Sequence, residues 1–343
     1  MGGEGIAAAA AKLTGWSWLV WLASQLHHPE WNGFTFYDLI FPLFLFIAGV
    51  AMPFSFEKRL ERGDSKQQLY RHVIVRGLLL VFLGMIYNGL LKFDWPSTRL
   101  PSVLGRIGLA YLFAGLIVLN TRPRGQIGWI IGILIGYWAA LRFIPVPEFG
   151  AHDLTPGHTL PDYIDRLLIP GRLHVGNRDP EGLMSTIPAV ATALFGAVTG
   201  HLLKYEKLSG LSKTAIMIVV GCACLLLAYL WNFEFPINKN LWTSSFVLRC
   251  AGWSLLFLAL FYVVIDVWDW RAWAFPWIVI GSNSILIYLA DRFVDFEHTA
   301  DFFFAGAIKH TGIYQLLLGA IAIVFTKWLL LWFLYRRRIF LRV

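Results

Sequence analysis

Charged residues are scarce in this sequence. Only 15% of its 343 residues are Asp, Glu, Lys or Arg, whereas 57% are hydrophobic and the mean hydropathy is +0.61. Soluble globular domains carry about 25% charged residues, so this balance excludes an ordinary soluble protein. The apolar runs have the length of membrane-spanning helices, about 20 residues, whereas the strands of a membrane β-barrel alternate over about 10. The composition therefore predicts an integral membrane protein of the helical class.

Cysteine is also rare, and basic residues are not clustered as in nucleic-acid-binding proteins. The three cysteines, Cys222, Cys224 and Cys250, all lie inside apolar runs, so neither a disulfide framework nor a zinc knuckle is indicated. The net charge of +8 comes from short loops between apolar runs, where basic residues act as topology signals. No nucleic-acid partner is expected. The N-terminus has no basic segment before an apolar stretch, so no signal peptide is expected either.

Nine apolar runs are long enough to cross a lipid bilayer. They cover 34–55, 71–92, 102–120, 126–144, 183–203, 212–231, 242–265, 273–292 and 313–335. The stretch 6–26 is interrupted by Lys12 and Gly15, which favours an interfacial helix over a tenth span. We therefore expect an all-α fold, a polytopic transmembrane helical bundle of about nine to ten spans, in a single membrane domain over 1–343.

The basic residues fall in alternate loops, and short cytoplasmic loops carry the excess of Lys and Arg. One set of loops contains Lys58, Arg59, Arg62, Lys66, Arg71, Arg122, Arg124, Lys204, Lys207, Lys213, Arg271 and the C-terminal RRRIFLR. The other loops are mixed or acidic. We therefore expect the N-terminal segment 1–33 outside the membrane and the C-terminus in the cytoplasm. The longest outer loop, 145–182, is rich in Pro, Gly, His and Asp, and we expect it to lie over a site.

That outer loop also raises the question of a metal. His152, Asp153, His158 and His174 are ligand types for zinc, but their spacing matches no ligand template. No metal is expected.

The segment HHPEWNGFTFYDLIF places titratable groups at the outer end of an apolar helix. His28 is the strongest candidate for a base or a nucleophile, because imidazole titrates near neutral pH. It needs an orienting partner, for which Glu30 and Asp38 are near in sequence. The alternatives stay open: a single interfacial histidine is often structural, and Asp38 could form a structural ion pair with Arg106.

Polar residues also stand before two other helices on the outer side. Asp179 and Glu181 could bind a substrate, but acidic residues also stabilise a helix start through its dipole. Asn238, Lys239 and Asn240 suit a hydroxyl-rich ligand, although a polar turn explains them almost as well.

Ionisable residues inside a span need a partner or a function. Arg106, together with Arg99, could hold a carboxylate or a phosphate at an outer helix end. Arg76 and Lys327 could bind an anionic cofactor from the cytoplasmic side, or could extend to the interface. Arg249 lies about two turns in from the outer side.

Glycines at four-residue spacing predict close helix packing in two spans. They are Gly128, Gly132 and Gly136 in one span and Gly196 and Gly200 in another.

HPEWNGFTFYDLIFPLFLFIAGVAM, with its His, Trp-Asn-Gly and Asp-Leu-x-Phe-Pro elements, resembles the signature of the heparan-alpha-glucosaminide N-acetyltransferase family. The resemblance continues in order through VLGRIGLAY, DPEGLMSTIPA, PINKNLWTSSFVL and GSNSILIY, and it is strongest to bacterial members with an unassigned-function label. Three departures are visible. Family members begin with a further helix, whereas this chain starts at MGGEG; Gly105 replaces the usual Gln; and Arg249 stands where residues are usually apolar or aromatic.

The resemblance implies transfer of an acetyl group from cytoplasmic acetyl-CoA to the amine of a glucosamine-type sugar on the outer side of a bacterial inner membrane. The family's active-site histidine corresponds to His28, either as a base or as a carrier of the acetyl group. We expect Arg76, Lys327 and Asn283 to contact acetyl-CoA, and Asn240 or Arg106 to stabilise the oxyanion.

The sugar would be bound by the 145–182 loop and the Asn238–Asn240 turn. A homodimer is expected by analogy with the family. The alternatives are a permease for N-acetylglucosamine or a related amino sugar, and a membrane scaffold without catalytic activity.

Overall fold

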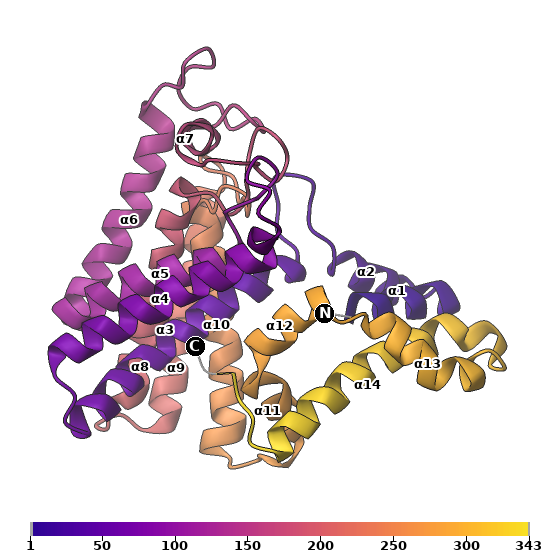
Figure 1. Cartoon of the computed structure of the whole chain (residues 1–343). Coiled ribbons are helices and arrows are strands. Elements are labelled where there is room, and N and C mark those ends of the chain that lie inside the picture. The colour runs from indigo at the N-terminus through magenta and orange to yellow at the C-terminus, as the bar shows by residue number, and fades with distance from the viewer. Residues whose placement is uncertain (1–2, 342–343) are drawn as a thin grey trace. The chain divides into compact units, whose positions relative to one another are not determined.

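The fold is helical throughout the part of the chain that can be described. The computed structural model describes residues 3–341 and contains helices, turns and loops but no strands within that range (Figure 1). The predicted all-α class is confirmed.

Eight helices in the described residues are long and apolar enough to cross a membrane. They are α3 (Phe36–Glu61), α4 (Lys66–Tyr87), α5 (Val103–Asn120), α6 (Pro123–Phe143), α8 (Ile187–Lys204) with η2 (Met184–Thr186), α9 (Gly210–Trp231), α10 (Ser244–Tyr262) with η3 (Val263–Val267), and α14 (Gln315–Arg336) with η5 (Gly312–Tyr314). The remaining predicted span, 273–292, is broken. It forms η4 (Ala272–Ala274), α11 (Phe275–Ser282) and α12 (Ser284–Phe293), with a bend of 56° at Asn283. The expected polytopic bundle is therefore confirmed, with one span discontinuous.

The other helices are short. They are α1 (Gly3–Thr14), α2 (Ser17–Ser24), η1 (Leu90–Lys92), α7 (Leu160–Leu168) and α13 (Phe296–Ile308). The stretch 6–26 thus forms two helices, separated at Gly15, whose φ of 65° favours glycine. Both are too short to span a bilayer. Trp18 and Trp21 of α2 are exposed, as is typical of a helix that lies at an interface.

The chain divides into two compact units. The central unit comprises 29–34 and 38–268, and the terminal unit comprises the described parts of 1–28, 35–37 and 269–343. Each unit is described by itself below.

Glycines bring α3 and α8 into backbone contact in the central unit. A Cβ added to Gly49 would lie 2.0 Å from the carbonyl oxygen of Ala193, and one added to Gly196 would lie 2.0 Å from that of Phe46. The predicted packing role of Gly196 is therefore confirmed. The prediction for Gly128, Gly132 and Gly136 is wrong within the described chain, because a Cβ at any of them meets nothing within 4 Å. Helix α6 packs through a different stripe, which contains Ile130, Leu134, Tyr137 and Leu141.

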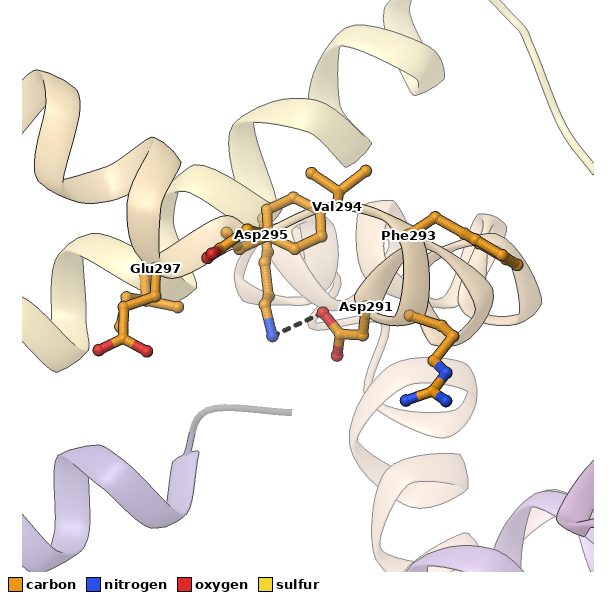
Figure 2. A pocket seen from close by; sticks show the side chains of 9 residues that line it. Asp291, Phe293, Val294, Asp295 and Glu297 are labelled. Carbon is orange, nitrogen blue, oxygen red and sulfur yellow. Dashed lines mark ion pairs between the residues drawn. The ribbon is translucent and has the colours of Figure 1, made fainter. Parts of the chain in front are cut away.

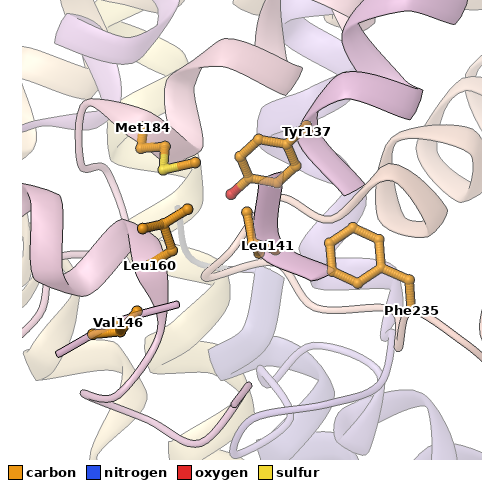
Figure 3. Close-up of a cluster of buried hydrophobic side chains, with 6 residues drawn as sticks. All are labelled: Tyr137, Leu141, Val146, Leu160, Met184 and Phe235. Atoms are coloured by element: carbon orange, nitrogen blue, oxygen red, sulfur yellow. The ribbon is translucent and has the colours of Figure 1, made fainter. Parts of the chain in front are cut away.

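The loops at one end of the central unit form a folded layer, which we call the α7 end (residues 88–102, 144–186 and 232–243). In Figure 1, α7 lies among these loops beside the upper end of α6. An apolar cluster lies beneath it and consists of Tyr137, Leu141, Val146, Leu160, Met184 and Phe235 (Figure 3). The predicted outer loop 145–182 is thus anchored to the bundle by its own buried side chains.

Helix caps set where the functional side chains stand at this end. Ser102 accepts a hydrogen bond from the Gly105 N–H at the start of α5, and Thr243 accepts one from the Phe246 N–H at the start of α10. These caps place Arg106 in the second turn of α5 and Lys239 just before α10.

In the terminal unit, α13 and α1 both pack against α14. The core of this unit contains Val279, Ile287, Phe296 and Leu331.

Candidate functional site

The α7 end of the central unit contains a buried ion pair. Asp38, in the first turn of α3, is fully buried, and the Lys239 Nζ lies 3.7 Å from its Oδ1. A carboxylate in a first helical turn is also stabilised by the helix dipole. The structural pair between Asp38 and Arg106 that the sequence left open is not formed; Lys239 is the ion-pair partner of Asp38 instead.

The residues on either side of Lys239 are fixed by hydrogen bonds of the 232–243 loop. The Asn238 side chain accepts from the Leu241 N–H at 2.9 Å and donates to the Asn32 Oδ1 at 3.0 Å. The Gly33 N–H donates to the carbonyl oxygen of Ile237 at 2.8 Å, so the Trp-Asn-Gly element is joined directly to this loop. Asn238 therefore positions Lys239, whereas Asn240 is half-buried next to it.

Electrostatics tune the Lys239 ammonium. Burial lowers its pKa below the ordinary value, although the carboxylates of Asp38 and Glu181 act in the opposite direction. A lysine in this state can donate hydrogen bonds as a cation and releases its proton more easily than an exposed lysine.

Arg106 organises the turn between α7 and α8. Its guanidinium donates to the carbonyl oxygen of Pro180 and to the Ser185 hydroxyl, and it contacts Thr186 Oγ1 at 3.4 Å. It also lies over the Trp242 ring, 4.7 Å from the centroid. These partners occupy Arg106, so it fixes the 179–186 turn next to the start of α10.

Arg99 binds both predicted carboxylates. Its Nε donates to Asp179 Oδ2 at 2.7 Å and its Nη2 to Asp179 Oδ1 at 2.6 Å, and Nη2 also donates to Glu181. Burial alone would lower the pKa of Arg99, but the hydrogen bonds and charges of these carboxylates raise it above the ordinary value. Asp179 also accepts from the His174 N–H at 3.1 Å. Asp179 is thus a structural anchor, and Glu181 is held by Arg99.

Asp165, on α7, was not singled out from the sequence. Its Oδ1 accepts from the Leu183 N–H at 2.9 Å, whereas its Oδ2 is buried and has no hydrogen-bond partner among the described residues. A Cβ added to Gly182 would lie 1.6 Å from that oxygen. Burial raises the pKa of the carboxyl to about 7, and the Asp179 charge adds to this rise. The spacing of Asp162 and Asp165 on one helical face was the available signal.

The histidines and acids of the 145–182 loop do not form a metal site. In residues 3–341, no group of three or more His, Cys, Asp or Glu side chains is arranged to hold a metal ion. The His158 Nδ1 lies 3.0 Å from Asp153 Oδ2, and its ring stacks on Phe149 at 3.9 Å.

His28 belongs to the terminal unit, whereas Glu30 and Asp38 belong to the central unit. His28 is exposed, and its ring centroid lies 4.7 Å from that of Tyr37. Glu30 is also exposed.

The three residues expected to contact acetyl-CoA lie in different places. Arg76, in the middle of α4, donates to the Tyr111 hydroxyl at 3.5 Å, and its Nε is buried without a partner in the described chain. In the terminal unit, Asn283 binds the backbone of Ile339 and Leu341 at 2.9 Å each.

Lys327 lines a pocket in the terminal unit. Its Nζ lies 2.8 Å from Asp291 Oδ1, so the side chain pairs within the unit. The pocket has a volume of about 580 Å³ and is lined mainly by the turn between α12 and α13 (Figure 2). The carboxylates of Asp291, Asp295 and Glu297 lie around it in Figure 2.

Comparison with known proteins gives three similarities. A family described as a domain of unknown function (DUF5009) matches residues 1–94. The chain is 29% identical to the heparan-alpha-glucosaminide N-acetyltransferase of Homo sapiens over 92% of this chain and 55% of that protein. It is also 29% identical to the protein of the same name from Mus musculus, over 78% of this chain and 49% of that protein. The chain therefore spans about half the length of these relatives.

Proposed function

We propose that this chain is a membrane N-acetyltransferase that moves an acetyl group from acetyl-CoA to the amine of a glucosamine-type sugar. The observation that carries the proposal is the buried Asp38–Lys239 pair, built by the Asp-Leu and Pro-Ile-Asn-Lys-Asn elements, in a chain similar along most of its length to proteins named for this activity.

The reaction needs a base and a group that stabilises negative charge. The amine nitrogen attacks the thioester carbonyl carbon, a C–N bond forms, the C–S bond breaks, and CoA leaves as a thiolate that takes up the proton lost by the amine. His28 is the proposed carrier of that proton, or of the acetyl group itself in a two-step route. Glu30 remains a candidate partner for orienting the imidazole.

Lys239 is the best-placed cation for the oxyanion in this proposal. The Arg106 donors are engaged by Pro180 and Ser185, whereas Lys239 is cationic, partly buried and fixed by its loop. Asn240, the next residue, is a second candidate donor. Glu181 and Asn238 would bind or orient the sugar nearby.

The proposed orientation has the α7 end outside a bacterial inner membrane and the C-terminus in the cytoplasm. The excess of Lys and Arg at the opposite end of the central unit supports it. Acetyl-CoA would then be taken from the cytoplasmic side. Among the three expected contacts, Arg76 is the best candidate to bind a phosphate of acetyl-CoA, because its Nε has no hydrogen-bond partner in the described chain. Lys327 and Asn283 already have partners within the terminal unit.

Sealed proteoliposomes test the reaction and its direction together. Acetyl-CoA labelled in its acetyl group is enclosed with the protein, and glucosamine is added outside. Labelled N-acetylglucosamine outside the vesicles supports the proposal. Absence of product, with acetyl-CoA supplied on both sides of the membrane, would overturn it.

The broken span favours a second candidate, an amino-sugar permease. Discontinuous helices with charged residues near the membrane midplane are typical of transporter binding sites. The bend between α11 and α12 makes this span discontinuous, and the Asp291–Lys327 pair places two charged residues beside the pocket. The same vesicles decide: a permease accumulates labelled N-acetylglucosamine without acetyl-CoA, and replacing Asp291 abolishes that uptake.

A homodimer is part of the proposal. The Gly128, Gly132 and Gly136 stripe borders an open groove on α6, and such stripes allow close helix approach. Cysteine crosslinking at Gly132 in native membranes tests it.

A further inference from the structure

Arg249 is a charged residue in a membrane-spanning helix without a charged partner. It is the sixth residue of α10, so it lies about 7 to 8 Å along the helix from its start. Its Nε is buried without a hydrogen-bond partner, and no ion pair or hydrogen bond connects it to any residue in 3–341.

Three other charged groups near the ends or in the interior of spanning helices have polar partners. Asp38 pairs with Lys239, and Arg106 donates to oxygens of the 179–186 turn. In the terminal unit Lys327 pairs with Asp291. An ionisable residue inside a membrane segment marks a functional site by default, and it is retained where something neutralises it. Arg249, like Arg76 in the middle of α4, therefore has no charged partner within the described residues, and of the two only Arg249 lies near the start of its helix.

Aromatic rings hold the Arg249 guanidinium. The guanidinium carbon lies 5.5 Å from the centroid of the Phe34 ring and 6.0 Å from that of Trp253. Contacts with ring faces stabilise the cation but supply no acceptor for its N–H groups. A guanidinium presents a planar fork of donors that matches a carboxylate or a phosphate.

Arg249 also lies close to the proposed reaction site. The Phe34 ring that packs on the Arg249 guanidinium also packs on Phe246, and Phe246 contacts Trp242 in the loop that contains Lys239. Phe34, which packs on the guanidinium, belongs to the same short segment that leads into Asp38. A ligand held by Arg249 would thus extend toward the Asp38–Lys239 pair.

We propose that Arg249 binds an anionic oxygen group, a carboxylate or a phosphate, carried by the acceptor, so that the acceptor is an acidic amino sugar. This inference rests on the proposed function for the identity of the acceptor. The same chemistry could come from a phospholipid headgroup, but the burial of Nε against Phe34 favours a ligand that enters the site.

The test measures binding and acetyl transfer separately, in nanodiscs of neutral phosphatidylcholine. The probes are glucosamine, glucosamine 6-phosphate and muramic acid. We expect the wild-type protein to bind one of the acidic sugars roughly 10- to 100-fold more tightly than glucosamine, the usual weight of a charge-assisted hydrogen bond. Arg249→Gln should bring that ratio close to one, and Arg249→Lys should retain part of it.

Arg142→Gln is the matched control. It removes an outer guanidinium that pairs with Glu234 at the end of α6, and the binding ratio should not change. Size-exclusion profiles show whether each variant is folded. If Arg249→Gln does not fold, Arg249→Lys still tests the site, because it should lower the binding ratio.

The outcomes separate this inference from the proposed function. Preferential binding that depends on Arg249, without acetyl transfer, supports the anion site and overturns the transferase. Transfer without an acidic preference, or with a preference that survives Arg249→Gln, overturns the anion site alone. If Arg249 instead confers thermal stabilisation by anionic phosphatidylglycerol and no sugar preference, the ligand is a lipid headgroup and the inference is wrong.

Discussion

The Nζ of Lys239 lies 3.7 Å from Oδ1 of the fully buried Asp38, and this pair joins the start of α3 to the loop before α10. Removal of one partner leaves a buried charge without compensation, which costs roughly 3 to 5 kcal/mol. We therefore expect Asp38→Asn and Lys239→Met each to lower the thermal stability of the purified protein clearly.

The double variant Asp38→Asn/Lys239→Met separates stability from chemistry. We expect it to recover much of the lost stability, because no buried charge is left unpaired, and yet to have no acetyl transfer. Stability losses that simply add would show that the two side chains do not interact. Acetyl transfer by the double variant would show that the reaction does not require the Asp38–Lys239 pair.

The raised pKa of Asp165 should make the stability of the folded protein depend on pH. This pKa is raised from 3.8 to about 7 in the folded protein, so the folded state binds more protons than the unfolded state between these values. The contribution is fully present below about pH 4 and is lost as the pH rises through about 7. Asp162, Asp179 and Arg106 are the charged groups that act on it.

Thermal unfolding of wild type and Asp165→Asn between pH 5 and 8.5 checks this. The wild type should lose stability relative to the variant as the pH rises. Asp153→Asn is the control, since the pKa of Asp153 is lowered, chiefly by its hydrogen bonds with Thr155, so this carboxyl does not itself take up a proton in this range. Parallel curves for wild type and Asp165→Asn would contradict the assignment.

The contact between α3 and α8 makes Gly49 intolerant of a side chain. A Cβ there would lie 2.0 Å from the Ala193 carbonyl oxygen, so Gly49→Ala must separate two helices. Overpacking of this kind costs roughly 1 to 3 kcal/mol or more. We expect a lower melting temperature in detergent.

Gly319→Ala, in α14, is the matched control, because it also adds one methyl group to a spanning helix but meets nothing within 4 Å. Its melting temperature should equal or exceed that of the wild type, as alanine has the higher helix propensity. Equal losses in both variants would show that the α3–α8 contact is not the cause.

The positions of the spans were predictable because length and hydropathy are local properties. All nine apolar runs correspond to helices with small shifts of their ends. The break at Asn283 was not predicted, since the proline of this run, Pro276, lies in the first turn of α11 and not at the bend. At the bend, the Asn283 amide donates a hydrogen bond to the carbonyl oxygen of Ile339 and accepts one from the Leu341 N–H, and both residues are distant in the sequence.

The site was predictable as a set of residues but not as a set of partners. Asp38, Arg106, Asp179, Glu181 and Lys239 were all identified from their positions at the predicted outer ends of helices. Their pairing depends on which loops contact one another across the bundle. Composition and spacing do not determine those contacts. For the same reason Asp165 was missed: its importance comes from contact with Gly182 and Leu183, on another segment.

The most direct test of the central claim is acetyl transfer from radiolabelled acetyl-CoA to an amino sugar by the purified protein in nanodiscs, with wild type beside His28→Ala. Glucosamine and its acidic derivatives serve as acceptors. The account predicts labelled N-acetylated sugar from the wild type and none from the variant. Binding of the sugar without any transfer by the wild type, or equal transfer by His28→Ala, would contradict it.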